Sequence, residues 1–296
     1  MKNTLPIRLQ RDIQTCLNET VGSKLRVKRF EPIYGGDINQ SYKVLTNAED
    51  FFVKINDAHI FPGMFEKEAD GLTRLASTGS IRLPQVITIG RSGDFQFLVL
   101  EYIEQSPPSK DFWENFGHGV ADLHRHTQRH YGLAYDNYIG SLIQINTEDE
   151  SWVNFFIRNR LRVQLNRAIN KNLVDFECIE GFEKLFDQLH DLLPVEFPHF
   201  LHGDLWSGNF LTGPQGEPVL IDPAIYYGHR EMDLAMTMLF GGFDDRFYQA
   251  YHESYPLLPG WEERIPIYQL YPLLVHLNLF GSGYYGQICR ILEKLT

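Results

Sequence analysis

The run HGDLWSGN at residues 202–209 carries residue types that suit phosphoryl transfer. His202, Asp204 and Asn209 follow the spacing H-x-D-x-x-x-x-N, and Asp222 comes 18 residues after Asp204, in the sequence IDP. In phosphoryl transfer, one carboxylate orients the attacking hydroxyl and accepts its proton, while a second carboxylate and an amide oxygen hold Mg²⁺ against the nucleotide phosphates. We assign the first role to Asp204 and the second to Asn209 and Asp222. The alternative, that His202 and Asp204 only cap a turn, would suit an isolated HGD but not the whole run.

A lysine and a glutamate in the first third of the chain supply a matching nucleotide contact. Lys54 lies in the apolar segment FFVKIN, where an ammonium group needs a partner. Glu68, 14 residues later in FEKEADGL, is the expected partner, and such a pair orients the lysine onto the α- and β-phosphates. Glu66 competes for this role, but the apolar positions of the same segment place Glu68 nearer the buried face. Alternatively, Lys54 lies at the edge of a strand with its ammonium group in water.

Two further segments are expected to bind nucleotide through their backbones. Gly35 and Gly36 lie in YGGDINQS, 19 and 18 residues before Lys54, where successive N–H groups can cradle phosphates. Alone, this segment also fits a simple hairpin turn. The apolar run FLVLEYI ends in Glu101, Tyr102 and Ile103, whose backbone groups are expected to stay unpaired and to bind the adenine edge.

The pattern of elements divides the chain near residue 105. Leu9, Ile13 and Leu17 repeat at helical spacing, which predicts a short amphipathic helix that ends near Gly22. Between residues 25 and 104, β-prone runs surround one helix at 65–75, in the order β-β-β-α-β-β, which favours an antiparallel sheet with one helix packed on it. Beyond Pro107 and Pro108, helical periodicity covers residues 112–123 and 161–169, and further helices are expected at 178–193, 231–240 and 265–294. We therefore predict an α+β protein with an N-terminal lobe at 1–104 and a helical C-terminal lobe at 105–296.

Composition excludes several classes of protein. The chain has 296 residues, of which 43% are hydrophobic and 22% charged, and a net charge of −11. These values suit a globular enzyme and oppose binding to nucleic acid or to anionic lipid. Cys16, Cys178 and Cys289 are too few and too far apart for a disulfide framework. No segment reads as a signal peptide or a membrane span, and we expect a cytoplasmic monomer.

The chain resembles the fructosamine kinase (ketosamine 3-kinase) family of the kinase-like superfamily. The resemblance rests on HGDLWSGN, on IDPAIYYGHREMDLAM, on FFVKIN with FEKEADGL, and on ADLHRHTQRHYGL, and it covers about residues 20–295. It implies a protein-kinase-like two-lobe fold of the aminoglycoside phosphotransferase type, with a five-stranded N-terminal lobe. Relative to eukaryotic protein kinases, HGD replaces HRD and DPA replaces DFG, and no activation segment is found.

The resemblance implies ATP and Mg²⁺ as cofactors, and transfer of the γ-phosphoryl group to the 3-hydroxyl of a ketosamine, either small or attached to an amino acid or protein. Asp204 is then the base, Asn209 and Asp222 are the Mg²⁺ ligands, and Lys54 binds ATP phosphates. We interpret Asp233, in HREMDLAM, as a brace that accepts backbone hydrogen bonds from the catalytic loop, with His202 in a similar supporting role.

The acceptor side is less defined by the sequence. Trp206, His229 and Arg230 are candidates for substrate contact, but His229 and Arg230 fit buried ion pairs equally well. A cluster of arginines is expected to be partly solvated and partly ion-paired (Arg158, Arg160, Arg162 and Arg167). Two other functions stay open: a related kinase acting on an aminoglycoside, choline or a thiosugar, and a nucleotide-binding pseudokinase.

Overall fold

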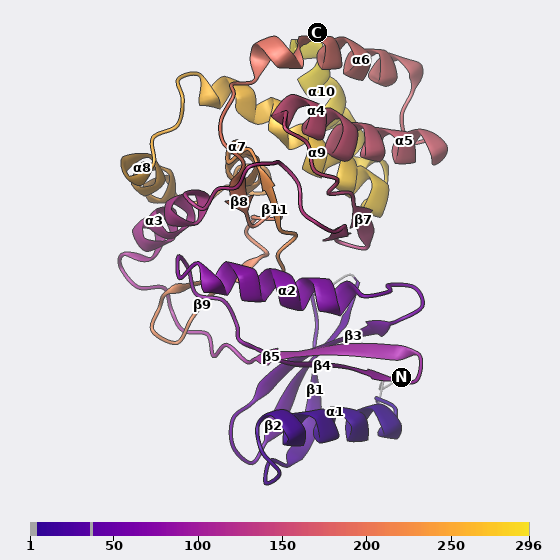
Figure 1. The fold of residues 1–296 in the computed structure, drawn as a ribbon, viewed down its shortest axis with the longest axis vertical. Coiled ribbons are helices and arrows are strands. Elements are labelled where there is room, and N and C mark those ends of the chain that lie inside the picture. Colours follow the sequence, from indigo (N-terminus) through magenta and orange to yellow (C-terminus); the bar gives the residue numbers. More distant parts are fainter. Residues whose placement is uncertain (1–4, 36–37, 296) are drawn as a thin grey trace. The chain divides into compact units, whose positions relative to one another are not determined.

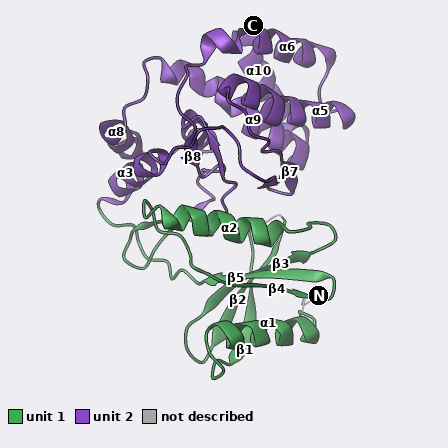
Figure 2. Ribbon diagram, viewed as in Figure 1, with its two compact units in different colours: residues 1–110, 211–222 green, residues 111–210, 223–296 purple. Residues whose placement is uncertain are grey.

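The structure, a computed structural model, describes residues 5–35 and 38–295. The chain forms two compact units (Figure 2). Unit 1 contains residues 1–110 and 211–222, and unit 2 contains residues 111–210 and 223–296.

Unit 1 is built on an antiparallel sheet. Within residues 5–35 and 38–110, five strands form the sheet in the order β1-β2-β3-β5-β4. Their bounds are β1 Val27–Ile33, β2 Gln40–Thr46, β3 Phe51–Asp57, β4 Val86–Ser92 and β5 Phe95–Glu101. The predicted sheet is confirmed, and its central strands β3 and β5 are the most apolar because both of their faces are covered.

Helices α1 (Ile7–Thr20) and α2 (Met64–Ser77) lie on opposite faces of this sheet (Figure 1). Leu9, Ile13 and Leu17 of α1 repeat at helical spacing and are buried in one core with Val53 and other sheet residues. The N-terminal helix was expected, but not its place on the sheet. The prediction of a single packed helix is therefore incomplete, since α1 covers the face that α2 leaves open.

A segment distant in sequence completes unit 1. Strands β9 (Phe210–Thr212) and β10 (Pro218–Leu220) form a hairpin, and β10 joins Arg82 through a parallel bridge at Val219. The Arg82 guanidinium binds the Glu217 carboxylate, and the Arg82 carbonyl accepts from the Leu220 N–H at 2.9 Å. The sequence-based division near residue 105 did not include this return of the chain, because it depends on contacts more than 100 residues apart.

Unit 2 is mainly helical. The larger helices are α3 Phe112–His124, α5 Arg162–Asn170, α6 Phe176–Leu192, α8 Asp245–Ser254, α9 Trp261–Phe280 and α10 Tyr285–Leu295. Shorter elements are β6 Asn137–Ile139, β7 Leu142–Gln144, α4 Trp152–Phe155, a π-helix at Phe156–Leu161, β8 His199–Leu201, β11 Tyr226–Gly228 and α7 Glu231–Thr237. Strands β8 and β11 pair, as do β6 and β7. Helix α8 and the β6–β7 hairpin were not expected.

The prediction of one helix over residues 265–294 is wrong at its centre. Gly281 has φ 92° and ψ −167°, a conformation that ends α9, and the 3₁₀ turn Ser282–Tyr284 leads into α10. Apolar periodicity continues across the turn, which explains the error. Among the described residues, no helix combines the length and apolar character needed to cross a bilayer.

The position of α1 generates a stability prediction. Ile13 is fully buried, so Ile13→Ala should lower the free energy of unfolding by about 2–5 kcal/mol, through lost burial and the cavity left behind. Ile7, on the same helix, is 68% exposed, and Ile7→Ala should cost under ~0.5 kcal/mol. Urea unfolding of both variants measures the difference. Equal effects would contradict the packing of α1 on the sheet.

Candidate active site

The Lys54 side chain is the electrostatic centre of unit 1. Lys54 lies on β3 and is 5% exposed. Its Nζ donates to Glu68 Oε1 at 2.7 Å and to Asp222 Oδ1 at 2.5 Å. The competing Glu66 is instead half-exposed, with its carboxylate 3.7 Å from Arg91. The Lys54–Glu68 pair expected from the sequence is present, and Asp222 is a second partner.

The two carboxylates keep Lys54 charged. Burial by itself lowers the pKa of the Lys54 ammonium, but the negative charges of Asp222 and Glu68 outweigh burial and raise it above its usual range. A buried ammonium held between two carboxylates is a fixed positive charge. Such a charge suits the binding of nucleotide phosphates.

Asp222 adopts a backbone conformation that few residues accept. Its φ is 55°, in the left-handed region that Asp tolerates better than most non-glycine residues, and Pro223 follows it. Its side chain is 44% exposed, and one carboxylate oxygen bonds Lys54. Backbone strain of this kind is concentrated at functional sites.

The backbone segments expected to bind nucleotide are only partly as anticipated. Gly35 is exposed with φ 128°, and Gly36 lies outside the described residues. The Glu101 N–H donates to the Gln85 carbonyl at 2.9 Å, so the expectation that it stays unpaired is wrong. This N–H is used because β4 and β5 remain paired to the end of β5. Among the described residues, Tyr102 and Ile103 make no backbone hydrogen bond outside the helices and strands.

The loop that carries Asp204 belongs to unit 2. Asn209 Nδ2 donates to both the carbonyl and the Oδ2 of Asp204, each at 2.8 Å, and the Asp204 N–H donates to His202 Nδ1 at 3.3 Å. These bonds fix the carboxylate. The amide nitrogen of Asn209 is therefore already hydrogen-bonded. Its Oδ1, the atom that could bind a metal, lies on the other side of the amide group.

Asp233 holds the start of this loop. Its carboxylate is buried and accepts from the His202 N–H at 2.8 Å and the Gly203 N–H at 2.9 Å, as the sequence interpretation expects. His124 Nε2 lies 3.2 Å from the same carboxylate. Gly203 has φ 83°, and a Cβ there would lie 2.0 Å from the Ala224 carbonyl oxygen, so only glycine fits.

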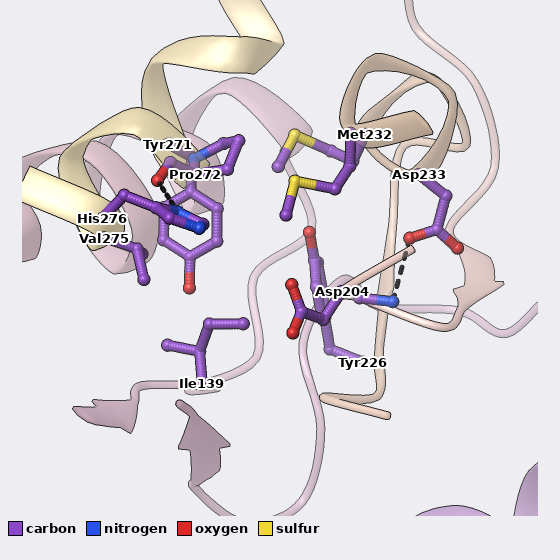
Figure 3. Close-up of a pocket in the computed structure, with 11 residues that line it drawn as sticks. Ile139, Asp204, Tyr226, Met232, Asp233, Tyr271, Pro272, Val275 and His276 are labelled. Atoms are coloured by element: carbon purple, nitrogen blue, oxygen red, sulfur yellow. Dashed lines mark hydrogen bonds between the residues drawn. The ribbon is translucent and has the colours of Figure 1, made fainter. Parts of the chain in front are cut away.

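Asp204 opens onto a recess within unit 2 (Figure 3). The tyrosine rings of Tyr226 and Tyr271 line it, with Met232 and His276. Burial raises the pKa of Tyr271 to about 12, so its hydroxyl stays protonated. The other lining residues are Ile139, Gly203, Asp233, Met236, Pro272 and Val275. An acidic group beside neutral hydroxyls and apolar walls suits an alcohol acceptor.

Sequence reasoning missed the buried support beneath the recess. Arg160 is fully buried, and its guanidinium lies 3.9 Å from the Tyr226 ring centroid and donates to Asn146 Oδ1 at 2.7 Å. The π-helix containing Arg160 shifts the helical register, which a regular 3.6-residue period could not show. Arg162 pairs with Glu183 at 2.8 Å, and Arg158 lies 3.7 Å from Asp149, both at the surface.

Two of the three candidate acceptor residues lie elsewhere. Arg230 is 3% exposed and donates to the Glu196 carboxylate at 2.8 Å, and His229 Nε2 lies 3.5 Å from the same carboxylate. Neither lines the recess beside Asp204. The ion-pair interpretation holds for Arg230, whereas His229 is buried beside the same carboxylate and burial lowers its pKa, so it does not form an ion pair. Trp206 is half-buried in the Asp204 loop, with its ring edge-on to Phe240.

The potential metal ligands can be assessed from their donor atoms. No group of three or more His, Cys, Asp or Glu that could hold a metal occurs in the part of the chain that the structure describes. Mg²⁺, however, usually takes only one or two carboxylates and completes its shell with water and substrate phosphates. Asp222 and Asn209 each offer the oxygen that such a site requires, so their chemistry fits Mg²⁺.

The five-stranded sheet of unit 1 and the mainly helical unit 2 are the elements of a kinase-like α+β fold. An aminoglycoside phosphotransferase solved with AMP-PNP and hygromycin B shares the fold, with a TM-score of 0.66 at 14% identity over 95% of this chain and 98% of that one. The family model for fructosamine kinase matches residues 9–296. The chain belongs to the fructosamine kinase family.

Several relatives that match this chain over most of its length have names that agree with this family. The chain is 40% identical to a "probable ketoamine kinase" of Enterococcus faecium, over 96% of this chain and 99% of the relative. It is 39% identical to the chloroplastic protein-ribulosamine 3-kinase of Oryza sativa subsp. japonica, over 93% and 80%. The crystal structure of a "putative fructosamine-3-kinase" from Haemophilus somnus 129PT superposes with a TM-score of 0.90 at 33% identity, covering 98% and 99%.

The buried His229 predicts a specific pH dependence of stability. Burial lowers the pKa of His229 from 6.5 to about 3, despite the nearby Glu196 carboxylate. Below pH 6.5 the unfolded chain therefore binds a proton that the folded chain does not, so this stability is present above pH 6.5 and is lost as the pH falls. Between pH 7.5 and 5.5 the loss should be about 1 kcal/mol.

Urea unfolding of wild type and His229→Gln at the two pH values measures this term. The variant should lose about 1 kcal/mol less than wild type on acidification. Burial raises the pKa of the Glu196 carboxyl, but His199 and Arg230 outweigh burial and bring this pKa well below its usual 4.5. Glu196 therefore titrates outside the window between pH 5.5 and 7.5. Substitution of the exposed His252 by Gln is the control and should keep the wild-type slope. Parallel slopes in all three proteins would contradict a neutral, buried His229.

Proposed function

We propose that this protein is an ATP-dependent kinase that phosphorylates the 3-hydroxyl of ketosamines and so starts their deglycation. The observation that carries the proposal is the Asp204 carboxylate, fixed by the Asn209 amide and opening onto the recess of unit 2. Membership of the fructosamine kinase family supports the acceptor, and the names of the relatives support the ribulosamine and fructosamine classes.

Unit 1 would bind the nucleotide. The Lys54 ammonium, oriented by Glu68, would contact the α- and β-phosphates. The Asp222 carboxylate and the Asn209 amide oxygen would hold Mg²⁺, which neutralises charge on the phosphates when bound. Gly35 and the backbone of Tyr102 and Ile103 would contribute phosphate and adenine contacts.

Unit 2 would handle the acceptor. Asp204 would accept the proton of the 3-hydroxyl while the hydroxyl oxygen forms a bond to the γ-phosphorus of ATP. The bond between the γ-phosphorus and the oxygen that bridges it to the β-phosphorus breaks at the same time and releases ADP. Asp233 holds the backbone of His202 and Gly203, which keeps the carboxylate in place during the transfer.

The product accounts for deglycation. Once C1 of the 3-phosphorylated ketosamine loses a proton, the resulting 1,2-enaminol expels phosphate from C3. Water then hydrolyses the imine formed at C1 and frees the amine. The kinase thus has to make only the phosphate ester.

An acceptor panel tests this function. Mg²⁺-dependent ADP release should occur with a ribulosamine or a fructosamine and stay at background with an aminoglycoside, choline or a thiosugar. Release with one of the latter three alone would assign a different acceptor. Silence on every acceptor with ATP still bound would favour a nucleotide-binding pseudokinase.

Removal of the base should stop turnover without preventing ATP binding. Asp204→Asn keeps the shape of the side chain but cannot accept the proton, so kcat should fall by about 10²–10⁴-fold. The Kd for ATP, measured by calorimetry, should stay within ~2-fold. The exposed Asp191→Asn is the matched control and should keep full activity. Wild-type turnover in Asp204→Asn would remove Asp204 from the mechanism.

Removal of Asp222, the proposed cation ligand in unit 1, should instead weaken the binding of ATP. Asp222→Ala deletes both the proposed Mg²⁺ ligand and one partner of Lys54, so the affinity for ATP in the presence of Mg²⁺ should fall at least ~10-fold. Asp94, whose side chain is 79% exposed in the same unit, provides the control Asp94→Ala. Equal calorimetric affinities for all three proteins would exclude Asp222 as a ligand.

A further inference from the structure

A group of aromatic rings lies beside the Asp204 recess and is not used by the chemistry described above. We call it the aromatic shelf. Its rings come from the Asp204 loop, the segment after α7, the end of α9 and the turn that follows. The members are Trp206, Phe240, His276, Phe280 and Tyr284.

The rings of the shelf are in mutual contact. Phe240 lies centrally, with its ring centroid 4.5 Å from that of His276, 5.8 Å from Trp206 and 6.3 Å from Tyr284. His276 in turn lies 5.5 Å from Phe280 and 5.1 Å from Tyr284. These spacings are those of packed aromatic pairs, so the shelf is a continuous surface and not a set of separate rings.

The shelf is continuous with the candidate active site. His276 lines the same recess as Asp204 (Figure 3). Trp206 stands two residues after Asp204, and Ser207 Oγ donates to the Phe240 carbonyl at 3.3 Å, which ties the shelf to the Asp204 loop. A molecule placed with one end at Asp204 would therefore meet the shelf with its other end.

The shelf is also accessible and has the electronic character to receive a cation. Phe280 is 50% exposed, and the other four members are partly exposed. Burial lowers the pKa of His276, and its Nδ1 bonds the Pro272 carbonyl at 2.8 Å, so its ring is neutral and does not repel positive charge. Exposed aromatic faces attract ammonium groups and alkyl chains.

We propose that the aromatic shelf binds the amine side of the acceptor: the secondary ammonium of a ketosamine and the alkyl chain that bears it, as in a sugar attached to a lysine side chain. The proposal rests on the ketosamine kinase function. In such a molecule four bonds separate the 3-oxygen from the nitrogen, and an extended zigzag of four ~1.5 Å bonds with tetrahedral angles spans roughly 5 Å. With the 3-hydroxyl at Asp204, the ammonium would lie near His276, which lines the same recess, and the chain would continue toward Phe280.

Two acceptors with the same sugar separate the shelf from the sugar site. One is a ribulosamine of methylamine, and the other is a ribulosamine formed on the ε-amine of Nα-acetyllysine. Wild type should favour the lysine derivative by about 10-fold in kcat/KM, since only the lysine chain is long enough to bury methylene groups against the shelf. Phe280→Ala should abolish most of this preference and leave kcat/KM for the methylamine derivative within ~2-fold.

Two further variants guard against indirect effects. Phe280→Trp keeps an aromatic face and should retain the preference for the lysine derivative. Phe176, 76% exposed at the start of α6 and outside the shelf, provides the control Phe176→Ala, which should change neither acceptor.

Equal use of the two acceptors by wild type, or a loss in Phe280→Ala that is the same for both, would overturn the shelf while leaving the kinase function intact. Failure of wild type to use either acceptor would instead refute the ketosamine kinase function, and the shelf proposal with it.

Discussion

The burial of one ammonium group is the constraint around which unit 1 is organised. Lys54 lies in the middle of an apolar sheet, where an unpaired charge would be strongly destabilising. Its two partners arrive from different segments: Glu68 from α2 and Asp222 from the end of the β9–β10 hairpin. Pairing this charge therefore joins three parts of unit 1: the sheet, α2 and the returning segment 211–222.

In unit 2 the buried charge that needs partners is an anion, the Asp233 carboxylate. The buried Asp233 carboxylate is satisfied by backbone N–H groups of His202 and Gly203 and by His124, so the loop leading to Asp204 is fixed by hydrogen bonds from behind. Arg160 supports the adjoining tyrosine wall in a similar way, through carbonyl and amide contacts and the Tyr226 ring. Both groups are buried, and both hold in place other groups that line the recess.

The sequence predicts the parts of the site that depend on residue type and local spacing. Examples are Lys54, Glu68 and the Asp204 loop. A lysine in an apolar strand and the spacing H-x-D-x-x-x-x-N are uncommon away from phosphate-binding and catalytic sites. The sequence does not predict what depends on distant contacts or on small changes of helical register. Gly281 ends α9 while apolar periodicity continues, and the π-helix turns Arg160 inward. Arg230 pairs with Glu196, more than 30 residues away.

The position of the phosphate on the product tests the central claim most directly. The account predicts that ¹H–³¹P NMR of the product from a ribulosamine and ATP shows phosphorus coupled to the proton on C3, followed by loss of that signal as phosphate and free amine appear. Coupling to a proton on any other carbon, or a stable product that releases no amine, would contradict assignment of Asp204 as the base for the 3-hydroxyl.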